Sequence, residues 1–380
     1  MKYDQIPSKL FIKNRKNFMA QMKPKSVAVF NSNDIYPIGA DSTMPFQQAR
    51  DIFYLTGADQ EETILVLFPD APNKEHREML FVRETNDHIA VWEGEKLTKE
   101  KATEVSGIKS IYWLKEFDKI FFEVMTQAER IYFNTNEHYR QSVETETRED
   151  RFIQKTKEKF PAHSWERSNP ILQRLRSVKD KIEIDILQQA CDITEKGFRR
   201  ILNFVEPGVW EYEIEAEFMH EFLRNRSRGF AYTPIIASGN NANVLHYIEN
   251  NQQCKKGDLL LLDVGAEYAN YSSDMTKALL DLKLLDKADV KNEDPNWPAY
   301  KKYFMHGTSH HIGLDTHDYG ILWEKMTEDM VFTVEPGIYI PEEGFGIRLE
   351  DDVVIQKKGE PFNLMRNIPI EAEEIEDLMN

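Results

Sequence analysis

The chain has 380 residues, 41% of them hydrophobic, which is enough for two domains that each have a core. The net charge of −17 disfavours binding to nucleic acid or to an anionic membrane surface. No apolar run approaches the ~20 residues of a membrane span, and the start MKYDQIPSKL lacks the apolar core of a signal peptide. Cys191 and Cys254 belong to no spacing motif and are typical of buried thiols. We therefore expect a cytoplasmic protein.

Residues 1–165 are expected to form a first domain of the α/β class, because helical and strand patterns alternate along them. The segment contains no cluster of acids and histidines, so we assign it no chemistry of its own. The patterns predict helices at Lys9–Met22, Lys99–Val105 and Glu116–Gln127, and strands at Ser26–Phe30, Asp51–Gly57, Thr63–Phe68, Glu78–Arg83, His88–Trp92 and Arg130–Phe133.

The charged segment Lys155–Pro170 is expected to be a linker, with a second domain over residues 170–380. Apolar residues at 3,4 spacing then predict a helix over Lys179–Phe204, which ends before Pro207-Gly208. A second helix is expected over Glu211–Arg224, followed by a strand over Ala231–Ser238.

Acidic residues then recur inside apolar, strand-like segments. Leu259–Val264 holds Asp263, and the expected return strand Tyr271–Thr276 holds Asp274, 11 residues later. Two further strands are expected, Phe332–Ile340 with Glu335 and Ile347–Ile355 with Glu350 in its middle.

A single such acid is compatible with a strand end or a surface ion pair, but four of them with His310 indicate a metal site, because a buried carboxylate is costly unless it is paired or bound to metal. Mostly oxygen ligands with one imidazole suit Mn²⁺, Co²⁺, Fe²⁺ or Zn²⁺. Five ligands exceed what one ion with an open position needs. Two ions roughly 3.5–4 Å apart, activating a water molecule, fit better.

The order Asp263, Asp274, His310, Glu335, Glu350 resembles the dinuclear site of the pita-bread metallopeptidases, a family that includes methionine aminopeptidase, prolidase, creatinase and Xaa-Pro aminopeptidase. The run HGTSHHIGLDTHD, with Ser309 before His310, is most similar to Xaa-Pro aminopeptidase, and the likeness covers nearly the whole chain. It implies a creatinase-type α/β N-terminal domain and an α+β catalytic domain, in which a curved antiparallel sheet is backed by helices.

The resemblance also implies an activity, the metal-dependent release of the N-terminal residue from peptides with proline in second position. It implies two divalent ions as cofactors, with Mn²⁺ as the first candidate. It assigns His246 to substrate contact and His317 to proton transfer at the scissile bond, although a histidine beside Tyr247 is otherwise typical of a structural role. Arg348 lies two residues before Glu350 and is expected to orient it or hold substrate, or else to form a salt bridge.

Two N-terminal residues match positions that in Xaa-Pro aminopeptidase reach the active site of a neighbouring subunit. These are Trp92 in AVWEG and Asp41 in GADSTMPF, which implies a homo-oligomer, a dimer or a tetramer. The alternative is a packing tryptophan and a turn aspartate.

One departure from the family follows Asp274. His310 follows Asp274 by only 36 positions, whereas relatives carry about 40–50 residues more there, room for two helices and a turn. We expect one helical pair to be missing, with a short helix over Ala278–Leu285 in its place. Prolidase, which cleaves Xaa-Pro dipeptides, is one alternative to the aminopeptidase. The shortened domain leaves two more open, an inactive protein and a metal-free binding scaffold of the same fold.

Overall fold

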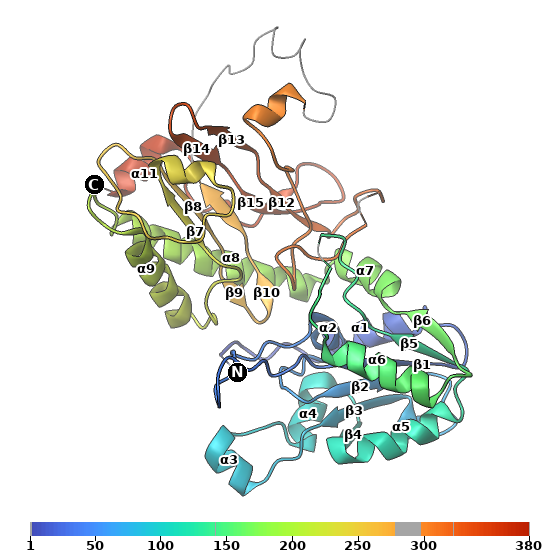
Figure 1. The fold of residues 1–380 in the computed structure, drawn as a ribbon. Helices are drawn as coiled ribbons and strands as arrows, with labels where there is room; N and C mark the ends of the chain where they lie inside the picture. Colours follow the sequence, from blue (N-terminus) through green and yellow to red (C-terminus); the bar gives the residue numbers. More distant parts are fainter. Residues whose placement is uncertain (1, 141, 278–297, 322, 380) are drawn as a thin grey trace. The chain divides into compact units, whose positions relative to one another are not determined.

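The computed structural model describes the whole chain except residues 1, 141, 278–297, 322 and 380 (Figure 1). Its contacts define two units, one of Gln5–Arg176 and one of Ser177–Asn380 together with Met1–Asp4. The expected linker is not a linker, because it holds the end of helix α6 (Arg148–Lys159) and strand β6 (Ser164–Arg167). None of the described helices is long and apolar enough to cross a membrane.

The N-terminal unit is built on a six-stranded mixed sheet in the order β4-β3-β2-β1-β5-β6. The central strand β1 pairs antiparallel with β2 and parallel with β5. Its side chains alternate between two cores, since Val27 and Val29 join a cluster with Phe121 of α5, whereas Phe30 packs on Phe18 of α1. The bounds are β1 Ser26–Asn31, β2 Ile64–Leu67, β3 Glu78–Val82, β4 Ser110–Trp113, β5 Arg130–Phe133, α1 Lys9–Met19, α4 Lys99–Ser106 and α5 Phe117–Met125.

Two strands expected in this unit are helices. Residues 51–56 belong to α2 (Arg50–Thr56), which is buried on nearly all sides and therefore lacks the helical period that would have revealed it. Gly57 ends α2 with φ 68°, and a Cβ there would lie 2.2 Å from the ring of Phe11. Residues 88–92 belong to α3 (Asp87–Glu93), whose first turn is capped by the Asn86 side chain.

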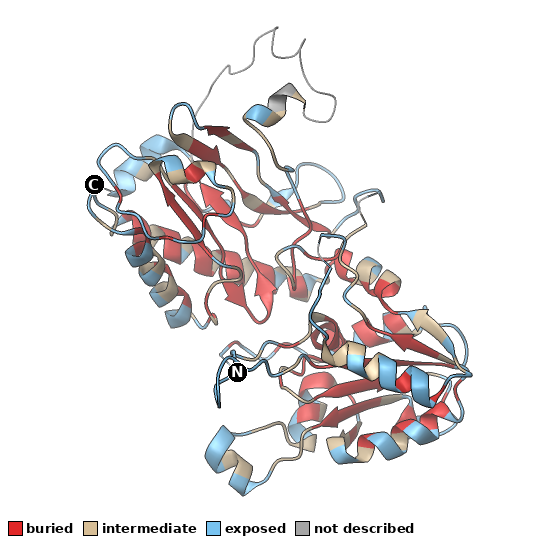
Figure 2. Cartoon of the chain, viewed as in Figure 1, coloured by how far each residue is buried: buried red, intermediate tan, exposed pale blue. Residues whose placement is uncertain are grey.

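The second unit, here called the catalytic unit after the domain that the resemblance predicts, contains the expected helical pair, α8 (Lys181–Leu202) and α9 (Glu211–Arg224), packed against each other. Asp180 caps α8 by accepting a hydrogen bond from the backbone of Ile182, and Glu183 completes a capping box. The apolar side chains of both helices are mostly buried and most of their charged side chains reach solvent (Figure 2), but Glu183 and Glu211 are buried.

The strands of this unit pair antiparallel throughout the part of it that the structure describes. They form ladders in the orders β11-β8-β7, β12-β15-β16, β13-β14 and β10-β9. The bounds are β7 Ile235–Ser238, β8 Leu260–Val264, β9 Glu267–Tyr268, β10 Tyr271–Ser272, β11 Met275–Lys277, β12 Val331–Val334, β13 Gly337–Ile340, β14 Phe345–Arg348, β15 Asp351–Val354 and β16 Phe362–Asn363.

Three strands expected to be continuous are each broken, and every break falls at a candidate ligand. Asp274 lies between β10 and β11, Glu335 between β12 and β13, and Glu350 between β14 and β15. At the last break the backbone pairs across to another ladder, where the Glu350 N–H donates to the carbonyl of Thr276 at 2.7 Å. The breaks therefore bring ligands from separate ladders together.

The expected short helix Ala278–Leu285 lies outside the described residues. Within the described part of the catalytic unit, α8 and α9 form one helical pair, and the helix that follows the last strand is α11 (Ala372–Met379). Helix α7 (Asn169–Ser177) ends at the boundary between the units.

Candidate metal centre

Asp263 and Asp274 lie side by side on neighbouring antiparallel segments. Asp263 is in β8, which pairs with β11, and Asp274 immediately precedes β11. The hydroxyl of Tyr232 lies 2.6 Å from an oxygen of each carboxylate. Both carboxylates are buried, at 7% and 6% exposure, so they sit close together in a medium that favours pairing with a cation.

His310 is held in the orientation of a metal ligand. Its Nδ1 lies 3.0 Å from the carbonyl oxygen of His311, to which it can only donate. The Nε2 lone pair therefore faces the acids, 3.6 Å from an oxygen of Asp274 and 3.7 Å from one of Glu335. A histidine whose second nitrogen donates to a backbone carbonyl is the usual arrangement around a bound metal.

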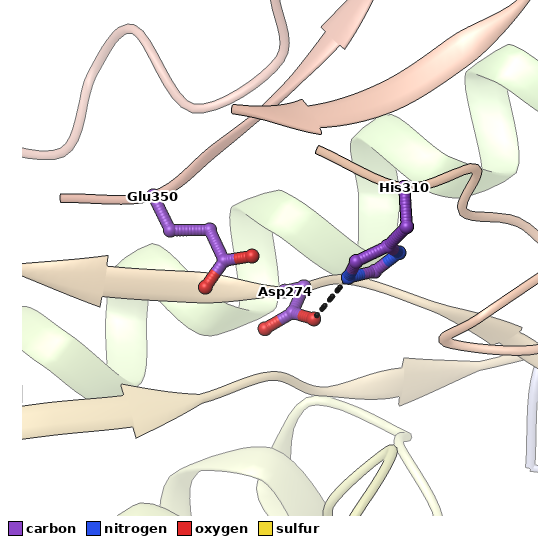
Figure 3. A group of neighbouring side chains, drawn as sticks. All are labelled: Asp274, His310 and Glu350. Atoms are coloured by element: carbon purple, nitrogen blue, oxygen red, sulfur yellow. Dashed lines mark ion pairs between the residues drawn. The ribbon is translucent and has the colours of Figure 1, made fainter. Parts of the chain in front are cut away.

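Glu350 completes a tight group. Ligand atoms of Asp274, His310 and Glu350 all lie within 4.8 Å of one another, and all three residues are buried (Figure 3). The hydroxyl of Thr276 donates to Glu350 at 2.9 Å, which fixes that carboxylate.

Arg348 is a buried supporting residue with 4% exposure. It forms an ion pair with Asp263 and donates to the Tyr339 hydroxyl at 2.6 Å and the Thr276 hydroxyl at 3.2 Å. Its Nε lies 4.0 Å from Glu350. Of the roles expected for Arg348, the structure shows the salt bridge with an acid, Asp263.

The acids repel one another and are poorly solvated. Burial raises the pKa values of Asp263, Glu335 and Glu350, and neighbouring carboxylates raise them further, against the lowering effect of Arg348. Burial by itself lowers the pKa of His310, but the hydrogen bond and charge of Asp274 outweigh it and raise that pKa. One arginine does not balance this many carboxylates. The donor set therefore fits divalent cations, which would offset the excess negative charge.

Three further histidines differ in their surroundings. The ring of His317 is exposed and stands edge-on to His310, with the centroids 4.4 Å apart. His306 lies 3.6 Å from Glu335 and 2.8 Å from the Tyr339 hydroxyl. His246 is exposed in the segment after the short helix η3 (Gly239–Asn243).

Asp41 and Trp92 belong to the N-terminal unit. Both are exposed, and Trp92 is 77% exposed on α3. Their roles as substrate-binding residues stay predictions.

Several supporting residues escaped the sequence analysis. Asp352 accepts hydrogen bonds from the backbone of Asp274 at 3.1 Å and from the Cys191 thiol at 3.5 Å. Thr276 and Asp352 each follow a ligand by two residues, a spacing that places side chains on one side of a strand and could have revealed them. Tyr232 offered no such signal, because it lies 31 residues before Asp263 in an irregular segment.

Comparisons with known proteins agree with this geometry. The family profile for the aminopeptidase P N-terminal domain matches residues 11–132, and the profile for metallopeptidase family M24 matches residues 185–292 and 283–357. The Xaa-Pro aminopeptidase of Escherichia coli is 29% identical, with 99% of this chain and 98% of that protein covered. Human Xaa-Pro aminopeptidase 3 is 27% identical, with 96% and 83% covered.

Solved structures show the same similarity. The low-pH form of aminopeptidase P from E. coli superposes with a TM-score of 0.86 at 27% identity and covers 99% of both chains. The E. coli enzyme with the inhibitor Pro-Leu superposes with a TM-score of 0.85 at the same identity.

The two profiles fall on the two units found from contacts, and the structural match spans both. The acids and His310 lie within the segment that the M24 profile matches. The chain therefore belongs to the aminopeptidase P family, with an aminopeptidase P-type N-terminal α/β domain and a catalytic domain of the M24 pita-bread metallopeptidase fold.

Proposed function

We propose that this protein hydrolyses the bond between the first residue and a proline in second position of a peptide. The observation that carries the proposal is the buried group Asp274, His310 and Glu350, with Asp263 and Glu335 beside it, in a chain whose full-length relatives are Xaa-Pro aminopeptidases. Specificity for proline rests on those relatives.

The proposed cofactor is a pair of divalent ions, with Mn²⁺ as the first candidate and Co²⁺, Fe²⁺ or Zn²⁺ as alternatives. Asp263 would hold one ion, His310 and Glu335 the other, and Asp274 and Glu350 would contact both. Such ions, when bound, act as Lewis acids and lower the pKa of water. Tyr232 and Arg348 position Asp263, and Thr276 positions Glu350.

His317 is the proposed proton-transfer residue, because it is exposed and lies beside His310 without contributing to the group of buried ligand atoms. It would move a proton to the nitrogen of the leaving proline. His317→Ala should lower kcat by about 10²–10⁴-fold while the metal content stays unchanged. Loss of metal in that variant would instead make His317 a ligand. His246 is the proposed contact for the substrate carbonyl.

Asp41 and Trp92 are proposed to contact substrate bound by a neighbouring subunit of a homo-oligomer. Support comes from α3, on which Val91 and Trp92 are 80% and 77% exposed and no residue is buried. Sedimentation of the full chain checks the oligomer. Trp92→Ala should raise KM with little change in the oligomeric state, and an unchanged KM would contradict the assignment.

The deciding experiment compares an Xaa-Pro-Yaa tripeptide with an Xaa-Pro dipeptide, each with and without added Mn²⁺. Release of the first residue from the tripeptide, stimulated by Mn²⁺, supports the proposal. Preference for the dipeptide would identify a prolidase. A tripeptide with alanine in second position is the control for proline specificity.

One observation favours the inactive or binding scaffold as a second candidate. The M24 profile matches in two segments that overlap over residues 283–292. The alignment with the E. coli enzyme extends over 440 residues, more than the 380 of this chain. The relatives therefore carry residues in the catalytic domain that this chain lacks. A protein of verified mass that binds metal but cleaves neither peptide would be the inactive form, and one that also binds no metal would be the metal-free scaffold.

A further inference from the structure

We propose that Glu211 is a positioning residue that holds the segment of residues 238–252, here called the 238–252 loop, in the shape that presents His246 to substrate. The inference rests on the proposed function, because it concerns how one of the proposed substrate-contacting residues is held. It starts from a buried carboxylate that the metal centre does not use.

Glu211 is the first residue of α9 and is fully buried. One carboxylate oxygen accepts hydrogen bonds from the backbone and hydroxyl of Ser238, at 2.8 and 2.7 Å, and from the side-chain amide of Asn241 at 3.1 Å. The other accepts from the Tyr247 hydroxyl at 2.7 Å and the backbone of Gln252 at 2.9 Å. All these donors are neutral and all belong to the 238–252 loop, so one carboxylate joins its beginning, middle and end.

The bond to Tyr247 acts directly on the neighbouring His246. Tyr247 is 7% exposed and its hydroxyl is bound to Glu211, whereas His246 projects from the next position and is exposed. Since the two side chains are attached to consecutive residues, fixing the tyrosine fixes the backbone that carries the histidine. Glu215, one turn further along α9, accepts a hydrogen bond from Asn250 at 2.9 Å and supports the same loop.

The 238–252 loop also touches the strand that leads to the metal centre. Its short helix η3 packs on β14, and a Cβ at Gly346 would lie 2.4 Å from the carbonyl oxygen of Ala242. Strand β14 ends at Arg348, which is paired with Asp263. A shift of the 238–252 loop therefore has two routes to the reaction, through His246 and through β14.

Glu211→Gln is the main test, because it replaces one acceptor oxygen by an N–H₂ group that faces N–H donors in either orientation. We expect kcat/KM for an Xaa-Pro tripeptide to fall about 10–100-fold while the metal content is unchanged. Glu213→Gln is the matched control: it makes the same change in the same turn of α9, on an exposed residue that only caps its own helix, and should leave activity unchanged. If Glu211→Gln fails to fold, Tyr247→Phe removes one of the hydrogen bonds to Glu211, together with the longer contact of that hydroxyl with Asn251 at 3.4 Å, and should lower kcat/KM about 2–10-fold.

A combination of variants separates positioning from general support. If Glu211 acts through His246, Glu211→Gln should have little further effect in a His246→Ala background. If Glu211→Gln lowers kcat/KM by the same factor in the His246→Ala background as in the wild type, the proposal is overturned. Full activity of both Glu211→Gln and Tyr247→Phe would also overturn it.

Amide hydrogen exchange of the 238–252 loop requires no catalysis and should be faster in Glu211→Gln than in the wild type, with exchange in β8 unchanged. Unchanged exchange in the 238–252 loop would contradict the proposal even if the wild type were inactive. Failure of the wild type to cleave Xaa-Pro peptides, by contrast, would refute the proposed function and leave the exchange result to decide the positioning role.

Discussion

The two units of the molecule solve the problem of burial in opposite ways. The N-terminal unit fills its sheet with apolar side chains, and β1 and β2 are buried along their whole length around one large cluster that includes Phe81 and Phe121. The catalytic unit also buries apolar side chains, but beside them it buries His310 and four acids at or next to the metal centre, namely Asp263, Asp274, Glu350 and Asp352. Apolar burial stabilises a fold directly, whereas buried charge costs free energy until a partner offsets it. The N-terminal unit therefore depends on packing, and the catalytic unit depends on what its acids bind.

The largest effect expected from this difference is the loss of Glu350. Glu350→Ala removes a buried carboxylate from the group that includes Asp274 and His310, and should abolish turnover and lower metal content. Metal analysis and peptide assays of the purified variant measure both. Full activity with unchanged metal would show that the buried acids serve another purpose, and Glu213→Gln provides a charge-change control outside the centre.

A core substitution should act on the other unit alone. Phe81 is fully buried against Tyr112 and Phe117, so Phe81→Ala should destabilise the N-terminal unit by about 3–5 kcal/mol through lost burial and a cavity. Denaturant unfolding measures the loss. Metal content should be unchanged, and a fall in metal affinity of the same size would show that the two units are not independent.

Removal of metal should have the reverse effect. A chelator should lower the unfolding temperature of the catalytic unit and leave that of the N-terminal unit unchanged, because the acids of the metal centre belong to the catalytic unit. An ion present at 100 times its dissociation constant contributes about 2.7 kcal/mol. Calorimetry with and without chelator tests this, and equal shifts of both transitions would contradict the comparison.

The smallest effect concerns pH. Burial, followed by the charge of Lys179, lowers the pKa of His311 to about 4. An unfolded histidine has a pKa of about 6.5, so between these values the unfolded chain binds a proton that the folded chain does not. Stability should therefore fall as pH falls through this window, by about 1.4 kcal/mol per pH unit.

His311→Leu should remove that slope. The substitution keeps an apolar contact with Phe332, whose ring centroid lies 4.3 Å from that of His311. Urea unfolding of the metal-free protein at pH 5.5 and 6.5 measures the difference. An equal slope in the variant and the wild type would assign the pH dependence to the acids of the centre instead.

The pattern of apolar runs located most strands of both units, because strand length and alternation are local properties. It failed at Asp51–Gly57, where a short helix buried on nearly all sides looks like a buried strand. It also missed the breaks at Glu335 and Glu350, since a break depends on which distant strand the backbone meets, as Thr276 meets Glu350. The candidate ligands could be named from the sequence through the resemblance, whereas Tyr232 and Glu211 became visible only once the fold had placed their partners.

The backbone bridge between Thr276 and Glu350 has a consequence for the order of folding. The two residues are 74 positions apart, and Arg348 reaches Asp263 across 85 positions. Contacts of such long sequence separation form late, because the chain entropy of closing a long loop must be overcome before any contact is gained. The ligands come together only when these ladders meet, so metal can be captured only by a nearly finished catalytic unit. Recovery of enzymatic activity after dilution from denaturant should accordingly mark the last step of assembly, whatever the speed at which the N-terminal sheet collapses.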